Sequence, residues 1–201
     1  MRGALLWKPL LVLACLLTLT CTTATLQAAG PVSQPAQPLG TAMTALPALT
    51  APPLHPDLTP VRLVIPRISV DAVIEARGLD PQRNLATPSN SNEVAWFNQG
   101  PPPGQAGNAI INGHVNWWTG TAVFARLAEL RPGDAVIVVR QDGTRASFTI
   151  SGARILAATA RDASLFAPVP TPTLTLITCS GPWDLRLGSD TERLLVSATL
   201  A

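Results

Sequence analysis

From Val61 to the C-terminus the sequence is a series of short apolar runs, and turn residues separate each run from the next. Runs of this length at a spacing of roughly ten residues are typical of an all-β sandwich or barrel. The clearest turn is Asp142-Gly143, a dipeptide that favours β-hairpins. Only Phe124–Leu130, with apolar residues at every third position, indicates a helix of one or two turns. The expected strands are 62–65, 68–74, 92–97, 109–114, 135–140, 146–150, 173–178 and 194–199.

The first 30 residues, 1–30, are typical of a membrane anchor or signal segment. Two basic residues precede a stretch, 9–30, that carries no charge. About 20 uncharged residues can cross a bilayer as a helix, and the basic flank predicts that the N-terminal tail stays inside. We expect a signal anchor that remains in the membrane, with cleavage near Ala28 and lipidation at Cys21 as the alternatives. Every alternative places residues 31–201 outside the cytoplasm.

Residues 31–60 are expected to be a linker. The segment contains eight prolines, and Asp57 is its only charged residue. A segment of this composition lacks the apolar residues for a packed core and favours extended polyproline geometry. The sequence therefore predicts a semi-rigid stalk that carries one domain, residues 61–201.

Charge and cysteine usage narrow the class of function. The net charge is +2 with 13% charged residues, and the basic residues are scattered, so we expect no nucleic-acid partner. Two of the three cysteines belong to the leader, which leaves Cys179 alone in the exported part. Because exported cysteines are usually paired, a lone one is either an inert buried thiol or a reactive nucleophile. The count alone does not decide between them.

A cysteine nucleophile needs a proton donor and acceptor, and histidine serves both tasks near neutral pH. His55 lies in the linker, so His114, at the end of an apolar run, is the candidate partner of Cys179. Arg193 begins the last apolar run, and an adjacent strand would return it beside Cys179, where a cation favours thiolate. Arg186 is its rival. No metal-ligand spacing is present, so we expect no metal and no cofactor.

Three segments resemble the sortases, the cysteine transpeptidases of bacterial cell surfaces. Thr-Leu-Ile-Thr-Cys at 175–179 is similar to their cysteine motif, and Ile-Asn-Gly-His-Val at 111–115 is similar to their histidine motif. Arg-Leu-Leu-Val-Ser-Ala at 193–198 resembles the arginine segment of the family. Further similar segments lie at 62–68, 78–80, 100–104, 122–124 and 130–134. Together the segments extend over about residues 61–200.

The resemblance implies a single eight-stranded sortase β-barrel with one or two short helices. Cys179 would attack the Thr carbonyl of an LPxTG-like sorting signal, between Thr and Gly, on a surface protein. His114 would protonate the leaving amine and deprotonate the incoming one, and Arg193 would bind the substrate carbonyl or oxyanion. Thr178 would line the site. The thioacyl group would pass to an amine of a peptidoglycan precursor or of a pilin, outside a membrane that the N-terminal segment anchors.

Some residues depart from the common sortase pattern. Asn116 stands where many sortases have Asp, and Trp117 and Trp118 follow it, as a wall of the groove or a cover over the site. Ser-Gly-Pro-Trp-Asp at 180–184 is closer to class E and class F-like sortases than to class A or B. No acidic loop suits calcium, so we expect none to bind.

Other classes of protein fit the order of residues less well. Papain-like proteases have Cys before His, and L,D-transpeptidases have the two close together, whereas His114 and Cys179 are far apart in this sequence. A non-catalytic wall-binding domain would need no such set of residues. A sortase that mainly hydrolyses, and an inactive sortase-like barrel that acts as a surface binding module, remain as alternatives. Anchoring of proteins and polymerisation of pili are not separated by the sequence.

Overall fold

The structure, a computed structural model, describes residues 57–201. The expected anchor or signal segment, 1–30, and the expected linker up to residue 56 lie outside the described residues. Among residues 57–201, no helix combines the length and the apolar character that crossing a bilayer requires.

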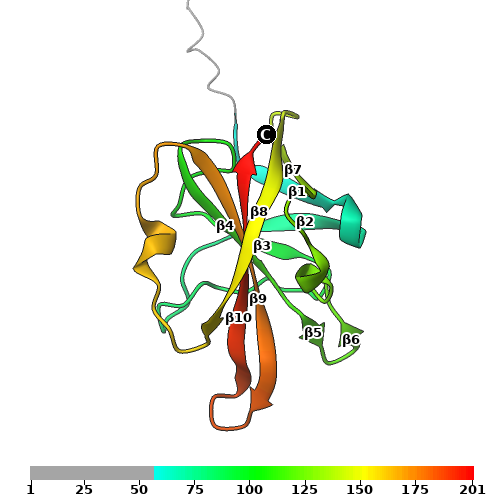
Figure 1. Ribbon diagram of the computed structural model, residues 1–201, viewed down its shortest axis with the longest axis vertical. Coiled ribbons are helices and arrows are strands. Elements are labelled where there is room, and N and C mark those ends of the chain that lie inside the picture. Colours follow the sequence, from blue (N-terminus) through cyan, green and yellow to red (C-terminus); the bar gives the residue numbers. More distant parts are fainter. Residues whose placement is uncertain (1–56) are drawn as a thin grey trace, which may run out of the picture. The chain divides into compact units, whose positions relative to one another are not determined.

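Eight strands form a closed barrel in the order β1-β2-β3-β4-β9-β10-β8-β7, which confirms the predicted all-β fold. Figure 1 shows the barrel and, next to it, the small β5–β6 hairpin. The barrel strands are β1 Pro60–Ile65, β2 Val70–Arg77, β3 Val94–Phe97, β4 Gly107–Gly113, β7 Ala135–Arg140, β8 Arg145–Ala157, β9 Pro172–Asp184 and β10 Ser189–Leu200. The outer hairpin pairs β5 Asn116–Trp117 with β6 Gly120–Thr121. The 3-10 segments are η1 Pro66–Ile68, η2 Leu127–Glu129 and η3 Ala163–Phe166.

The expected apolar runs all fall on strands, but several strands are longer than expected. β1 starts at Pro60, and the backbone of Asp57 and Thr59 already accepts hydrogen bonds from the β7–β8 turn. β9 does not end at Cys179, because it continues to Asp184, and β10 starts at Ser189. Figure 1 shows the resulting β9–β10 hairpin, which projects beyond the barrel. Arg193 is therefore the fifth residue of the last strand and not its first.

The side chains of β9 alternate between two apolar clusters. Leu174 and Leu176 belong to the main core, whose large members include Phe124 and Phe148. Ile177 belongs to a second, smaller cluster with Ile110 of β4 and Leu195 of β10. Since successive side chains of a strand point to opposite faces, the main core fills the barrel and the second cluster lies on its outer surface. Partly buried residues packed on this outer cluster are Leu85, Phe97, Leu156 and Leu165.

Candidate active site

Three adjacent strands bring His114, Cys179 and Arg193 together. Cys179 on β9 is paired with Arg193 on β10 in the antiparallel register. On its other side β9 runs parallel to β4, and the pairs keep a constant offset up to Asn112 and Ile177. The hydroxyl of Thr178 donates to the carbonyl of Gly113 at 2.8 Å, which keeps the same offset. The strand pairing itself ends at Asn112 and Ile177, and the same offset continued to residue 114 sets His114 opposite Cys179.

All three side chains line one cavity of about 810 Å³. Its floor includes Ile177 and Leu195 of the outer apolar cluster. The walls come from three connections, which are the β2–β3 loop near 79–87, the segment 156–166 before and within η3, and the β9–β10 turn near 183–190. The cavity thus has an apolar floor next to the thiol, the imidazole and the guanidinium, and its loop walls add charged side chains such as Asp80, Arg83 and Arg161.

Cys179 is half-buried, and no other cysteine occurs among residues 57–201. Burial raises the pKa of the Cys179 thiol, and the nearby carboxylate of Asp190 raises it as well. The positive charge of Arg193 and a hydrogen bond with Ser189 lower this pKa, but they do not outweigh burial. The thiol is therefore protonated at neutral pH in the free protein, and its nucleophilic form requires removal of a proton.

Two contacts hold the ring of His114. Its Nε2 atom lies 3.2 Å from the carbonyl oxygen of Pro88, in the β2–β3 loop. On another side the indole of Trp117 packs against the imidazole, with ring centroids 4.6 Å apart and planes tilted by 60°. The imidazole is consequently fixed from the loop and from β5, although His114 itself lies one residue beyond the end of β4.

The guanidinium of Arg193 is held by its own strand. Nη1 donates to the carbonyls of Asp190 and Glu192 at 2.9 and 2.7 Å, and Nη2 donates to the hydroxyl of Ser189 at 2.9 Å. Among the described residues the remaining two of its five N–H groups make no hydrogen bond, so they are available to a substrate carbonyl. Arg186, the rival candidate, is exposed in the β9–β10 turn and does not line the cavity.

Of the other expected site residues, Thr178 lines the cavity, whereas Trp117 and Trp118 do not. Thr178 lines the cavity, but its hydroxyl is engaged with β4, so it joins the two strands that carry Cys179 and His114. Trp117 contacts His114 without lining the cavity. Trp118 is 86% exposed in the β5–β6 turn and does not line the cavity either. The expected wall or cover formed by the two tryptophans is therefore not seen.

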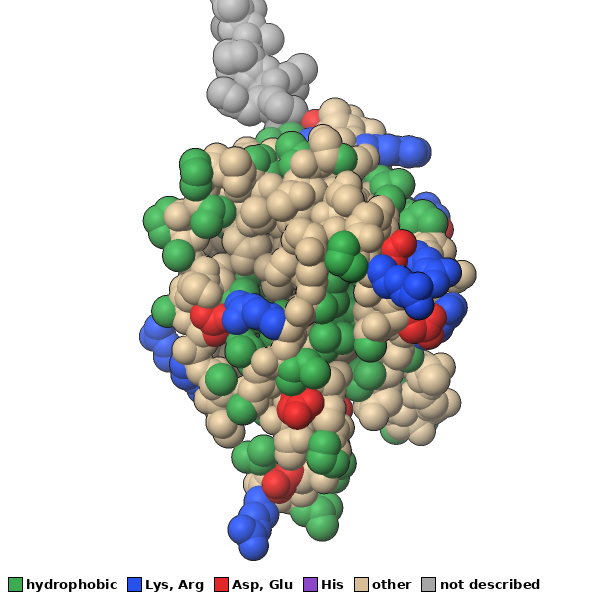
Figure 2. Space-filling view, in the orientation of Figure 1, with side chains coloured by type: hydrophobic (Ala, Val, Ile, Leu, Met, Phe, Trp, Pro, Cys, Tyr) green, Lys and Arg blue, Asp and Glu red, His purple; other side chains and the backbone are tan. Residues whose placement is uncertain are grey.

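Sequence reasoning missed several residues at the site. Ile177 and Leu195 could have been found, because they have the same strand parity as Cys179 and Arg193. Asp190, which is 8% exposed, and Pro88 carried no local signal. The exposed hydrophobic side chains near the turn of the β9–β10 hairpin, at the lower end of Figure 2, also went unnoticed; they are Trp183, Leu185 and Leu187.

The family model and the solved structures that match this chain all point to the same family. The Sortase domain model matches residues 63–201. No curated protein matches the chain significantly. Among solved structures, sortase C-1 from Actinomyces oris is 26% identical with a TM-score of 0.56, and the match covers 72% of this chain and 76% of that one. The lid mutant of sortase A from Corynebacterium diphtheriae is 21% identical with a TM-score of 0.55, over 71% and 70% of the two chains. Group B Streptococcus Pilus Island 1 sortase C2 is 19% identical with a TM-score of 0.55, over 70% and 73%.

Proposed function

The chain belongs to the sortase family, and we propose that it is an extracytoplasmic cysteine transpeptidase that cleaves a C-terminal sorting signal and joins it to an amine. One observation carries the proposal. Cys179 is flanked by His114 and Arg193 on neighbouring strands, and the three side chains line the same cavity. A structural thiol would need neither neighbour.

In the first half-reaction, His114 takes the proton of the Cys179 thiol, and the sulfur attacks the Thr carbonyl carbon of the signal. The Thr–Gly C–N bond then breaks, a thioester forms, and the leaving amine takes its proton from His114. In the second half-reaction an acceptor amine attacks the thioester, gives a proton to His114 and releases the thiolate. The unpaired N–H groups of Arg193 bind the oxyanion that develops in each step, which is the largest single contribution in many acyl transfers.

The groove fits an extended peptide with apolar side chains near the scissile bond. Ile177 and Leu195 provide an apolar floor that leads to Cys179. We propose an LPxTG-like signal on this basis and on the sequence motifs, with a surface protein as donor and a peptidoglycan precursor or pilin amine as acceptor. The likeness of segment 180–184 to class E and class F-like sortases supports membership of one of those classes, and residues 1–30 would hold the chain in the membrane with the barrel outside.

The test is mass spectrometry of the full chain incubated with LPxTG and LAxTG peptides and with a glycine-based or lysine-like amine. We expect a thioester adduct on Cys179 and a Thr–amine ligation product. Both products are absent in Cys179→Ala, which removes only the nucleophile, and nearly absent in His114→Ala. Cys15→Ala and Cys21→Ala, in the leader, are matched controls that keep both products.

Two other outcomes decide between the alternatives. An adduct that is released only by water would identify a hydrolytic sortase and refute transpeptidation with the amines tested. Absence of an adduct with every peptide, in a folded protein whose Cys179 also resists alkylation, would favour the inactive barrel that acts as a surface binding module.

A further inference from the structure

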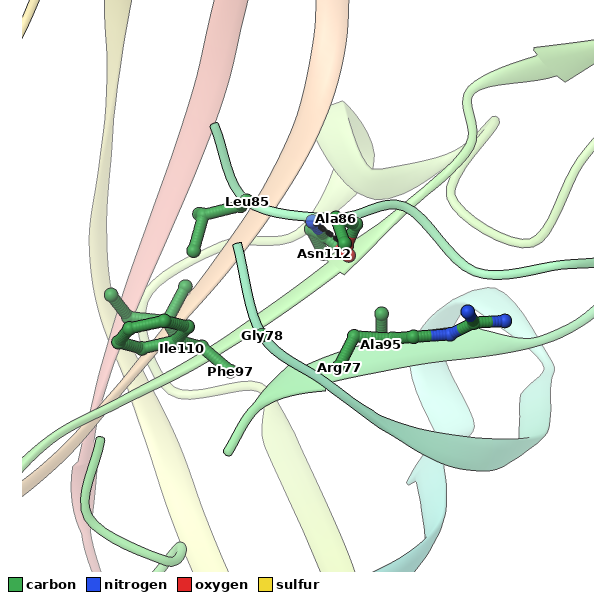
Figure 3. Close-up of a pocket in the computed structure, with 8 residues that line it drawn as sticks. All are labelled: Arg77, Gly78, Leu85, Ala86, Ala95, Phe97, Ile110 and Asn112. Atoms are coloured by element: carbon green, nitrogen blue, oxygen red, sulfur yellow. Dashed lines mark hydrogen bonds between the residues drawn. The ribbon is translucent and has the colours of Figure 1, made fainter. Parts of the chain in front are cut away.

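The β2–β3 loop carries Pro88, whose carbonyl is the acceptor for His114, and side chains of the barrel strands hold this loop on each side of Pro88. Asn112 of β4 donates from Nδ2 to the carbonyl of Ala86 at 3.1 Å, and Figure 3 shows this bond at the wall of a small pocket next to the groove. The opposite amide atom, Oδ1 of Asn112, is buried without a partner in the described part of the chain. The carbonyl of Ala86 can only accept a hydrogen bond. If the side-chain amide of Asn112 were turned over, its oxygen would face the Ala86 oxygen and no bond could form, so Nδ2 must be the atom that faces Ala86.

The second attachment lies on the other side of Pro88. The backbone N–H of Ser89 donates to Oε1 of Glu75 on β2 at 2.7 Å, and the guanidinium of Arg77 contacts both the hydroxyl of Ser89 and the carboxylate. The chain is thus held two residues before Pro88 and one residue after it. The position of the Pro88 carbonyl is therefore set by β4 and β2 and not by the loop alone.

The Pro88 carbonyl determines which nitrogen of His114 takes part in proton transfer. It lies 3.2 Å from Nε2, and a carbonyl oxygen accepts hydrogen bonds only. Nε2 must then carry a hydrogen in both the neutral and the charged imidazole. The proton that His114 gives to the leaving amine and takes from the incoming amine is consequently the one on Nδ1.

We propose that Asn112 is a positioning residue, which through Ala86 holds the Pro88 carbonyl against Nε2 of His114 and so reserves Nδ1 for proton transfer. The inference rests on the proposed function for the role of His114, but the tautomer is a property of the free protein. It assigns no contact with substrate to Asn112, only the orientation of the group that reacts.

The first test is nuclear magnetic resonance of the full chain with 15N-labelled histidine. The sequence has two histidines, and a His55→Gln variant leaves the signals of His114 alone. We expect, for the neutral imidazole of His114, a protonated-type Nε2, an unprotonated-type Nδ1 and an Nε2–H proton that exchanges slowly with water. A proton on Nδ1 with an unprotonated Nε2 would overturn the proposal without any assay of activity.

The second test replaces the donor of Asn112. Asn112→Asp keeps the shape but puts an oxygen in place of Nδ2, so the slowly exchanging Nε2–H signal should be lost. The rate constant for acylation of Cys179 at saturating peptide should fall about fivefold, the equivalent of one net hydrogen bond. Asn112→Ala, which removes the amide without adding a charge, should give the same spectral change.

The matched control lies on the same strand. Asn108 also donates from Nδ2 to a backbone carbonyl outside the barrel, that of Leu165 in η3 at 2.9 Å, but no hydrogen bond joins it to the loop that carries Pro88. Asn108→Asp should therefore keep the wild-type signals of His114. Loss of the Nε2–H signal in both Asn112→Asp and Asn108→Asp would show a general loosening of β4. Retention of the signal in Asn112→Asp would show that the Pro88 carbonyl keeps its place without the Asn112 hydrogen bond. Either result refutes the inference. A wild-type spectrum as expected, in a protein that forms no thioester, would refute the proposed function and leave the tautomer assignment standing.

Discussion

Gly113 is the last residue of β4 and precedes His114, so its packing decides where the imidazole stands. A Cβ added at Gly113 would lie 2.7 Å from Cδ2 of Phe124 and 2.9 Å from Cγ1 of Val123. Phe124 is fully buried in the main core, and because protein interiors are close-packed, we expect its ring to have little room to turn. The end of β4 must therefore move by about 0.7 Å to restore an ordinary contact of 3.4 Å.

Gly113→Ala should destabilise the protein and impair catalysis. Overpacking of a filled core costs typically 1–3 kcal/mol, and the lower entropy of the unfolded alanine chain returns about 0.5 kcal/mol. We expect a net loss of about 1–2 kcal/mol in the free energy of unfolding, measured by urea denaturation. Because a misplacement of about 1 Å in a catalytic group costs up to roughly 100-fold, acylation of Cys179 in the fully folded variant should slow by about 10- to 100-fold.

Gly152→Ala is the matched control for this prediction. Gly152 also lies within a strand, β8, but a Cβ there meets no atom within 4 Å. Its stability should be unchanged or higher by about 0.5 kcal/mol, and its acylation rate should equal that of the wild type. If Gly113→Ala unfolds at the wild-type urea concentration and acylates at the wild-type rate, the packing of Phe124 under Gly113 does not position His114.

Three further predictions concern residues on the barrel strands. Thr178→Val should cost about 1–2 kcal/mol, because it leaves the carbonyl acceptor on β4 without its donor; urea denaturation measures the loss, and Thr178→Ser should keep most of the stability. Burial raises the pKa of Glu75, but hydrogen bonds with Glu93, Ser89 and Arg77 outweigh it and lower this pKa to about 2. The ionised Glu75 should therefore stabilise the folded protein by about 2–3 kcal/mol at a pH above the unfolded pKa near 4.3, and this stabilisation is lost as the pH falls toward 2. Glu75→Gln should flatten this part of the stability profile, and an unchanged profile would contradict the low pKa. Alkylation of Cys179 should reach its half-maximal rate at a higher pH than alkylation of free cysteine does. Arg193→Gln should raise that pH further, and Arg186→Gln should leave it unchanged. A shift with Arg186→Gln alone would show that Arg186, and not Arg193, supplies the positive charge near the thiol.

The sequence predicted the strands of the barrel and the candidate residues His114, Cys179 and Arg193 because each carries a local mark. The strands are marked by apolar alternation, and Cys179 and His114 are the only cysteine and the only histidine among residues 57–201. Arg193, one of many arginines, was marked by its place at the start of the last apolar run. The extension of β9 beyond Cys179 had no such mark, because Ser-Gly-Pro-Trp-Asp at 180–184 shows no alternation. Its strand conformation is maintained by pairing with β10, from Asp184 opposite Ser189 to Cys179 opposite Arg193, and pairing of this kind is a tertiary effect that local propensity does not report.

The residues that contact or influence His114 and Cys179 from other parts of the chain were the hardest features of the site to predict from the sequence. Pro88 reaches His114 only because β2, the following loop and β4 are arranged around one end of the barrel, and Asp190 comes near Cys179 only through the hairpin. For Trp118, adjacency in the sequence to His114 indicated a place in the groove, but the β5–β6 hairpin turns that side chain away from the cavity. Closeness to His114 in the sequence therefore did not predict closeness to the cavity, because the chain turns at Trp118.

The parallel pairing of β4 with β9 has a consequence for how the protein folds. Thr178 and Gly113, which this pairing joins, are 65 positions apart in the chain, and contacts at such separation form slowly because a long loop must close before they stabilise anything. His114 and Cys179 therefore meet only when the barrel is almost complete. Enzyme activity that reappears during refolding would report the closing of the barrel itself, and a chain with earlier strands in place but β9 still free would have a cysteine without its imidazole.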